Sequence, residues 1–131
     1  LAQQLPSKVQ LKIYFVYQAW NVFDVARLIQ WVESQQTRRI DFVPLFLEHP
    51  DQIHSCVWPK EIRDETVRQL QELNTLRHKD AVERIINYTL NTDKYSEEHL
   101  TKMKQFISIN DKYRKFKFND IFPEFKDVLD L

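Results

Sequence analysis

Residues 9–47 read VQLKIYFVYQAWNVFDVARLIQWVESQQTRRIDFVPLFL, and this stretch decides the fold. From Val9 to Tyr17 every odd position is apolar, whereas Gln10 and Lys12 lie on the other side. This period of two predicts a β-strand. The run from Ile40 to Leu47 is short, apolar and rich in aromatic residues, so it predicts a second strand.

Between these strands the apolar residues change to helical spacing, which predicts a helix from about Val22 to Ser34. The residues that repeat at this spacing are Val22, Val25, Ala26, Leu28, Ile29 and Val32. Asn21 stands where the N-cap of that helix belongs, with Asp24 three residues on. Trp31 falls near the apolar stripe, and we expect it in the core.

Strand, helix and strand with short joints form one βαβ unit over residues 1–50, whose strands are parallel. The predicted fold class is therefore α/β. Pro44 cannot donate to a ladder, so the second strand is expected to end early or to lie at an edge. Parallel sheets are covered on both faces and usually hold about four to six strands. Two strands are too few, so we expect the sheet to be completed by preceding sequence, by a second copy of the chain, or by further strands within the helical half, and preceding sequence is the simplest expectation.

Residues 51–131 are predicted to form a mainly helical C-terminal extension that packs on the βαβ unit as one structural unit. Three helices are expected after Pro59, which suits a first-turn position, and the last of them is capped by Ser96. Met103 and Phe106 are expected in the core. The aromatic-rich residues 116–131 should pack back as a short turn-helix tail.

The composition excludes several classes of function. Lys plus Arg and Asp plus Glu balance at 19 each, so no overall charge favours a nucleic acid or an anionic membrane. The chain has no glycine, which excludes phosphate-binding loops, dinucleotide fingerprints and nucleophile elbows of the usual kind. One cysteine and the lack of a long apolar run predict a cytoplasmic protein without a membrane span.

Potential metal ligands gather after the second predicted strand, where His49, Asp51, His54 and Cys56 lie close together in sequence. Imidazole, carboxylate and thiolate could ligate zinc, or a histidine could activate the cysteine. However, the spacing fits no closed zinc site. We therefore predict neither a metal site nor a cysteine nucleophile here.

Cations alternate with aromatic rings from Lys112 to Phe118, a mixture that could bind phosphates while the rings stack on bases. A structural explanation is favoured. Basic residues suit the C-terminus of a helix, and Phe116 and Phe118 are expected to anchor the tail to the core. Nucleic-acid binding is therefore kept as an alternative and not expected.

Several segments, in this order, resemble the C-terminal portion of radical S-adenosylmethionine proteins that contain a twitch domain. They are the strand Leu11–Tyr17 running into Asn21, the segment FLEHP at 46–50, the turn VWPKEI at 57–62, and the tail segments DKYR at 111–114 and DIFPEF at 120–125. The resemblance covers nearly the whole chain through short motifs.

This resemblance implies that the two strands are the last of a partial (β/α) barrel. Members of the family bind a [4Fe-4S] cluster through a Cys-x-x-x-Cys-x-x-Cys loop, and the cluster reductively cleaves S-adenosylmethionine. That loop is absent, and Cys56 alone cannot hold a cluster. The cluster and S-adenosylmethionine are thus implied for a full-length protein and not for this chain, whose partner would be the N-terminal part of the same protein.

The resemblance also suggests roles for individual residues. Asn21 and Tyr17, at the end of the first strand, are the candidates for one wall of the substrate pocket. Asp111, Arg114, Pro123 and Glu124 match the tail pattern and are expected to be structural, with an ion pair that fixes the tail to the barrel.

The leading hypothesis is the C-terminal segment of a radical S-adenosylmethionine enzyme, inactive by itself. The alternative is a non-catalytic interaction module that completes its sheet by dimerisation or by docking on a partner. A nucleic-acid-binding domain is the third possibility.

Overall fold

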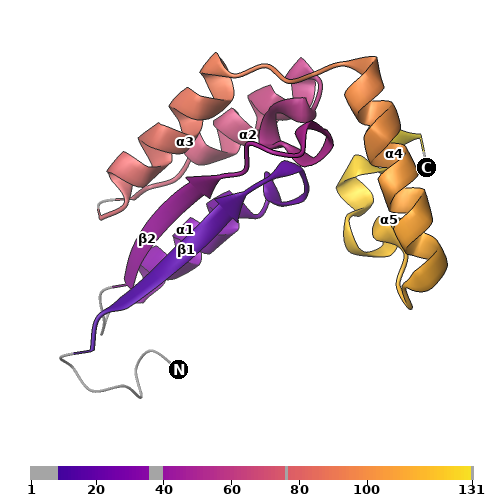
Figure 1. Cartoon of the computed structure of the whole chain (residues 1–131). Coiled ribbons are helices and arrows are strands. Elements are labelled where there is room, and N and C mark those ends of the chain that lie inside the picture. The colour runs from indigo at the N-terminus through magenta and orange to yellow at the C-terminus, as the bar shows by residue number, and fades with distance from the viewer. Residues whose placement is uncertain (1–8, 36–39, 76, 131) are drawn as a thin grey trace.

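The computed structural model describes residues 9–35, 40–75 and 77–130 (Figure 1). The strand β1, Leu11–Tyr17, is followed by the helix α1, Val25–Ser34, and by the strand β2, Ile40–Phe46. The two strands pair in parallel, from Leu11 opposite Ile40 to Tyr17 opposite Phe46. The predicted α/β fold with a βαβ unit is confirmed.

The sheet buries one of its two faces. That face carries the odd-numbered residues of β1 and the even-numbered residues of β2, and hydrophobic residues of α1 and α3 (Lys79–Asn91) pack against it. In Figure 1, α1 lies behind the two strands. On the opposite face Tyr14 is 61% exposed, Val16 43% and Leu45 45%. This open face is therefore apolar in its centre.

The outer edge of β1 presents peptide groups that have no backbone partner among the described residues. Leu47 N donates to Tyr17 O at 3.2 Å, which turns the odd-numbered residues of β1 toward β2. In a parallel ladder the alternate residues then point away, so Lys12, Tyr14 and Val16 direct their N–H and C=O groups outward. A further strand could pair with this edge.

The outer edge of β2 is blocked to strand pairing at two of its outward positions. The same alternation turns Ile40 and Pro44 outward, and Pro44 has no N–H to donate. His78 Nε2 lies 2.8 Å from the carbonyl oxygen of Ile40. Of the two possibilities expected for Pro44, the strand does not end early, because its missing donor faces away from β1. Within the described part of the chain β2 is an edge strand, as expected.

The helix α1 begins one turn later than predicted. A 3₁₀ turn, Ala19–Asn21, comes first, and Asp24 is the N-cap residue. The prediction that Trp31 is a core residue is wrong, because its side chain is 50% exposed. At about 100° per residue, Trp31 lies on the far side of the helix from the fully buried Ile29.

The C-terminal part is helical, as predicted. The helices α2 (Lys60–Gln71) and α3 (Lys79–Asn91) pack side by side, and α4 spans Glu97–Tyr113. Two short helices, α5 (Phe118–Ile121) and α6 (Lys126–Leu129), form the tail beside α4 (Figure 1). Among the described residues, no helix combines the length and the apolar character that crossing a bilayer requires.

Stacked aromatic rings join the tail to the βαβ unit. Trp58 is 0% exposed, and its indole Nε1 donates to the carbonyl of Ala19 at 2.7 Å. Phe125 from the tail is also 0% exposed, with its ring centroid 4.4 Å from that of Trp58 and 5.4 Å from that of Phe23. One hydrophobic cluster therefore includes residues from both parts of the chain.

The two phenylalanines expected to anchor the tail behave differently. Phe118 is 1% exposed and packs against Trp20, whereas Phe116 is 59% exposed. The prediction is wrong for Phe116, because that residue lies in the exposed turn between α4 and α5. Met103 is fully buried, as predicted. The prediction is wrong for Phe106, whose side chain is 39% exposed because its ring stacks on Trp20 at the surface of the cluster.

We predict that Phe125→Ala lowers the free energy of unfolding by about 3–5 kcal/mol, because it leaves a cavity beside Trp58. The matched control is Phe116→Ala, the same substitution at an exposed site, which should change it by less than about 0.5 kcal/mol. Urea unfolding followed by tryptophan fluorescence measures both. Equal effects of the two substitutions would contradict the assigned packing of the tail.

Candidate functional site

Tyr17, a predicted pocket residue, lies inside the core at the carboxyl end of β1. Its side chain is 0% exposed, and its hydroxyl lies 3.1 Å from Thr89 Oγ1. Thr89 donates its own hydroxyl proton to the carbonyl of Ile85, so Tyr17 is the donor to Thr89. Burial raises the pKa of Tyr17 above its usual range. Tyr17 thus ties β1 to α3.

Asn21, the second predicted pocket residue, is part of the turn that follows β1. Its Nδ2 donates to the carbonyl of Val16 at 2.8 Å, and its Oδ1 accepts from the N–H of Gln18 at 2.9 Å. The expectation that Asn21 caps α1 is wrong, because that helix starts after Asp24. Asn21 instead occupies the last outward carbonyl of β1 and so limits how far another strand can pair along this edge.

A chain of polar side chains lies at the carboxyl end of β2. The N–H of Cys56 donates to His54 Nδ1 at 3.0 Å, which leaves the proton of the neutral imidazole on Nε2. That nitrogen lies 2.7 Å from the hydroxyl of Tyr88, which donates to Glu48 Oε1 at 3.0 Å. The chain leads from the fully buried His54 to Glu48, whose side chain is 60% exposed.

The surroundings of His54, Tyr88 and Glu48 determine which of these three side chains carry a charge. Burial lowers the pKa of His54, although the nearby Glu48 carboxylate opposes that shift. Burial and the hydrogen bond to Glu48 raise the pKa of Tyr88 above its usual range. The arrangement is a carboxylate held by a neutral tyrosine and a neutral histidine. It can orient Glu48 toward a cation or a proton donor at the carboxyl ends of the strands, where parallel sheets bind ligands.

Cys56 and the neighbouring histidines do not assemble a reactive centre. Cys56 is 0% exposed, and burial raises the pKa of its thiol to about 11. His49 is exposed, whereas His54 is fully buried. Over the described ranges no three His, Cys, Asp or Glu side chains are grouped to hold a metal ion. An iron-sulfur cluster needs several thiolates, and the sequence offers one cysteine, so these residues do not fit that cofactor.

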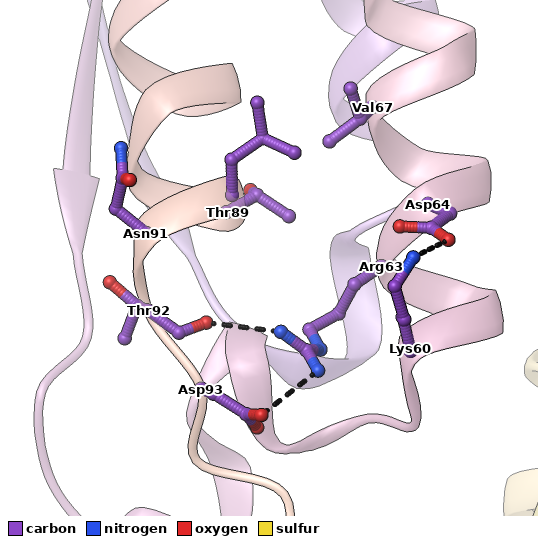
Figure 2. Close-up of a pocket in the computed structure, with 9 residues that line it drawn as sticks. Lys60, Arg63, Asp64, Val67, Thr89, Asn91, Thr92 and Asp93 are labelled. Carbon is purple, nitrogen blue, oxygen red and sulfur yellow. Dashed lines mark hydrogen bonds and ion pairs between the residues drawn. The ribbon is translucent and has the colours of Figure 1, made fainter.

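A cleft of about 320 Å³ lies between α2 and the end of α3 (Figure 2). Arg63 crosses it and bonds the carbonyls of Trp58 and Thr92, at 3.1 and 3.3 Å, and the carboxylate of Asp93 at 3.3 Å. Lys60 pairs with Asp64 on the same helix. Arg63 thus joins α2 to the loop after α3, and Lys60 is paired within α2, so the cleft carries no assignment to a ligand.

A second buried polar cluster, which the sequence did not predict, lies at the amino end of β2. Glu33 Oε1 accepts from the hydroxyl of Thr75 and, at 3.1 Å each, from the N–H groups of Arg77 and His78. His78 Nδ1 lies 2.8 Å from the same oxygen. Burial alone would raise the pKa of Glu33, but the hydrogen bonds from Thr75, His78 and the backbone lower it to about 2.

The predicted tail motif is partly assembled. Asp111 Oδ1 accepts from the N–H of Phe118 at 3.0 Å and lies 4.0 Å from Arg114 Nη2. Pro123 begins a 3₁₀ turn, Pro123–Phe125. Glu124 is exposed and has no ion pair with any described residue. Asp111 thus holds the start of the tail. Its ion pair with Arg114, three residues on, is local to the end of α4, and among the described residues no ion pair of this motif reaches the βαβ unit.

Comparisons with protein-family models, with curated proteins and with solved structures each found no match to this chain. A functional assignment must therefore come from its residues and their geometry.

We predict that stability falls as the pH is lowered from about 7 to about 5, because the folded protein binds a proton at His54 less readily than the unfolded chain. His54→Gln should flatten this pH dependence, and His49→Gln, at an exposed site, should not. Urea unfolding across the pH range measures the effect. An unchanged slope in His54→Gln would refute the assignment.

We predict that Glu33→Gln costs about 2 kcal/mol of stability at neutral pH, because charge-assisted hydrogen bonds are lost. The folded-state pKa lies below the unfolded value, so this contribution is present above about 4.5 and disappears as the pH falls toward about 2. The parent and Glu33→Gln should therefore have the same unfolding free energy in acid. Glu83→Gln on α3 is the exposed control. A difference in unfolding free energy between the parent and Glu33→Gln that persists in acid would argue against a role for the Glu33 carboxylate.

Proposed function

We propose that this chain is the C-terminal part of a radical S-adenosylmethionine enzyme and supplies the last strands of its partial (β/α) barrel. The observation that carries the proposal is the asymmetry of the sheet edges. Pro44 and His78 block two outward positions of β2. On β1, Asn21 occupies the carbonyl of Val16, whereas the outward peptide groups of Lys12 and Tyr14 have no backbone partner among the described residues. A sheet built this way can grow more readily on the β1 side, as the final strands of a barrel wall require.

The two faces of the sheet support the same proposal. In a (β/α) barrel the helices cover the outside, and the other face of each strand points to the interior. Here α1 and α3 pack on one face, and the opposite face carries Lys12, Tyr14, Val16, Val43 and Leu45. Tyr14, Val16 and Leu45 would then line the barrel interior in the assembled enzyme, which makes them stronger candidates for pocket residues than the buried Tyr17.

The chain's own contribution to catalysis would be the wall of the pocket. The [4Fe-4S] cluster that cleaves S-adenosylmethionine would be held by a Cys-x-x-x-Cys-x-x-Cys loop in the preceding part. At the carboxyl end of β2, Glu48 would be oriented by Tyr88 and His54 at the rim of the site. The proposed enzyme is cytoplasmic, because iron-sulfur clusters and the one free cysteine both suit a reducing compartment.

The same open edge also suits the alternative, an interaction module that dimerises through β1. The two readings differ in geometry, because a two-fold axis through a shared edge sets two copies of β1 antiparallel, whereas a barrel requires a parallel neighbour. Light scattering separates them. A stable dimer of the 131-residue chain would favour the interaction module.

The test is the longer polypeptide encoded by the same reading frame. We expect a Cys-x-x-x-Cys-x-x-Cys segment within about two hundred residues upstream, a typical barrel length. The polypeptide, reconstituted with iron and sulfide without oxygen and then reduced, should cleave S-adenosylmethionine. If the upstream sequence lacks the segment, or the reconstituted protein leaves S-adenosylmethionine intact, the proposal fails.

A pair of substitutions at Tyr14 links that activity to the edge of β1. Tyr14→Pro removes an outward N–H and leaves the β1–β2 ladder intact, so it should lower the cleavage rate at least about tenfold. Tyr14→Thr keeps the N–H and is the matched control. The 131-residue Tyr14→Pro chain should melt like the parent. Equal activity of the two variants would show that no strand pairs there.

A further inference from the structure

A basic and aromatic segment covers the last two residues of α4 and the exposed turn before α5. Residues 112–117 read KYRKFK, four cations and two rings without an acidic residue. All six residues are exposed. Phe116, the expected anchor of the tail, faces solvent instead.

The two rings of the segment are free of the core. Tyr113 is 86% exposed and Phe116 59%, whereas the neighbouring Phe118 is 1% exposed. Ile109, one turn before Tyr113 on α4, is 57% exposed and extends the apolar surface along the helix. Burying rings is favourable, so a run of large exposed side chains points to a binding surface.

The cations of the segment retain charge for a ligand. Lys112 and Lys115 form no ion pair with any described residue, and Lys115 Nζ lies 5.9 Å from the ring centroid of Phe116. Asp111 accepts from the backbone of Phe118 and lies 4.0 Å from Arg114. Asp120 accepts from the N–H of Lys117 at 3.3 Å. The nearest acidic side chains in sequence are thus engaged locally.

We propose that the segment 112–117 binds single-stranded nucleic acid. Lys112, Arg114 and Lys115 would contact phosphates, and Tyr113 and Phe116 would each stack on a base. A duplex hides the faces of its bases, so the exposed rings favour a single strand. An acidic peptide would match the cations and leave both rings without partners. The proposal is independent of the radical S-adenosylmethionine assignment.

The test is fluorescence anisotropy of labelled single-stranded RNA and DNA oligonucleotides of mixed sequence with the 131-residue chain at low salt. We expect binding that weakens steeply as salt is added. Tyr113→Ala and Phe116→Ala should each raise Kd about tenfold. The double reversal Arg114→Glu with Lys115→Glu should weaken binding further and reduce the salt dependence, because fewer counterions are released.

Matched controls use the same changes elsewhere on the surface. Tyr95→Ala removes a ring that is 41% exposed, and Lys60→Glu with Lys102→Glu reverses two exposed cations outside the segment. These controls should leave Kd within about twofold. Lack of binding at low salt, equal loss in the controls, or equal affinity for polyglutamate would each overturn the proposal. Circular dichroism and thermal melting confirm that each variant is folded.

Discussion

The outward peptide groups of Lys12 and Tyr14 on β1, which have no backbone partner in the described part of the chain, are the constraint on which the rest of the structure depends. The outward N–H and C=O groups of Lys12 and Tyr14 can be satisfied by water or by another strand. The other edge of the sheet is blocked by Pro44 and by the contact of His78 with Ile40. The chain therefore specifies both where its sheet ends and where it can continue.

The core is built to hold this two-stranded sheet from one side. Helices α1 and α3 cover a single face, and the stacked rings of Trp58 and Phe125 fix the tail to the turn after β1. Polar clusters hold the two ends of β2. Glu33 and His78 secure its amino end, and His54, Tyr88 and Glu48 lie at its carboxyl end. Both clusters join segments that are distant in sequence, so they also fix α3 against the sheet.

Local pattern predicted the elements of this fold well, because a period of two or of 3.6 reports directly on which face is buried. The strands β1 and β2 and the helices α1, α2, α3 and α4 follow from that signal. Local pattern failed where tertiary contacts decide whether a residue is buried and what it bonds. Trp31 and Phe116 are apolar yet exposed, and Asn21 bonds the carbonyl of Val16 instead of capping α1. The contact between Glu33 and His78 joins residues 45 positions apart, a distance that no local spacing reveals.

Amide hydrogen exchange along β1 tests the central claim most directly. In the 131-residue chain, the amides of Lys12, Tyr14 and Val16 should exchange fast, and those of Ile13, Phe15 and Tyr17 should be protected by the ladder with β2. In the longer polypeptide that includes the preceding sequence, the even-numbered amides should become protected as well. If they still exchange fast there, or are already protected in the isolated monomer, no further strand pairs with β1 and the account is contradicted.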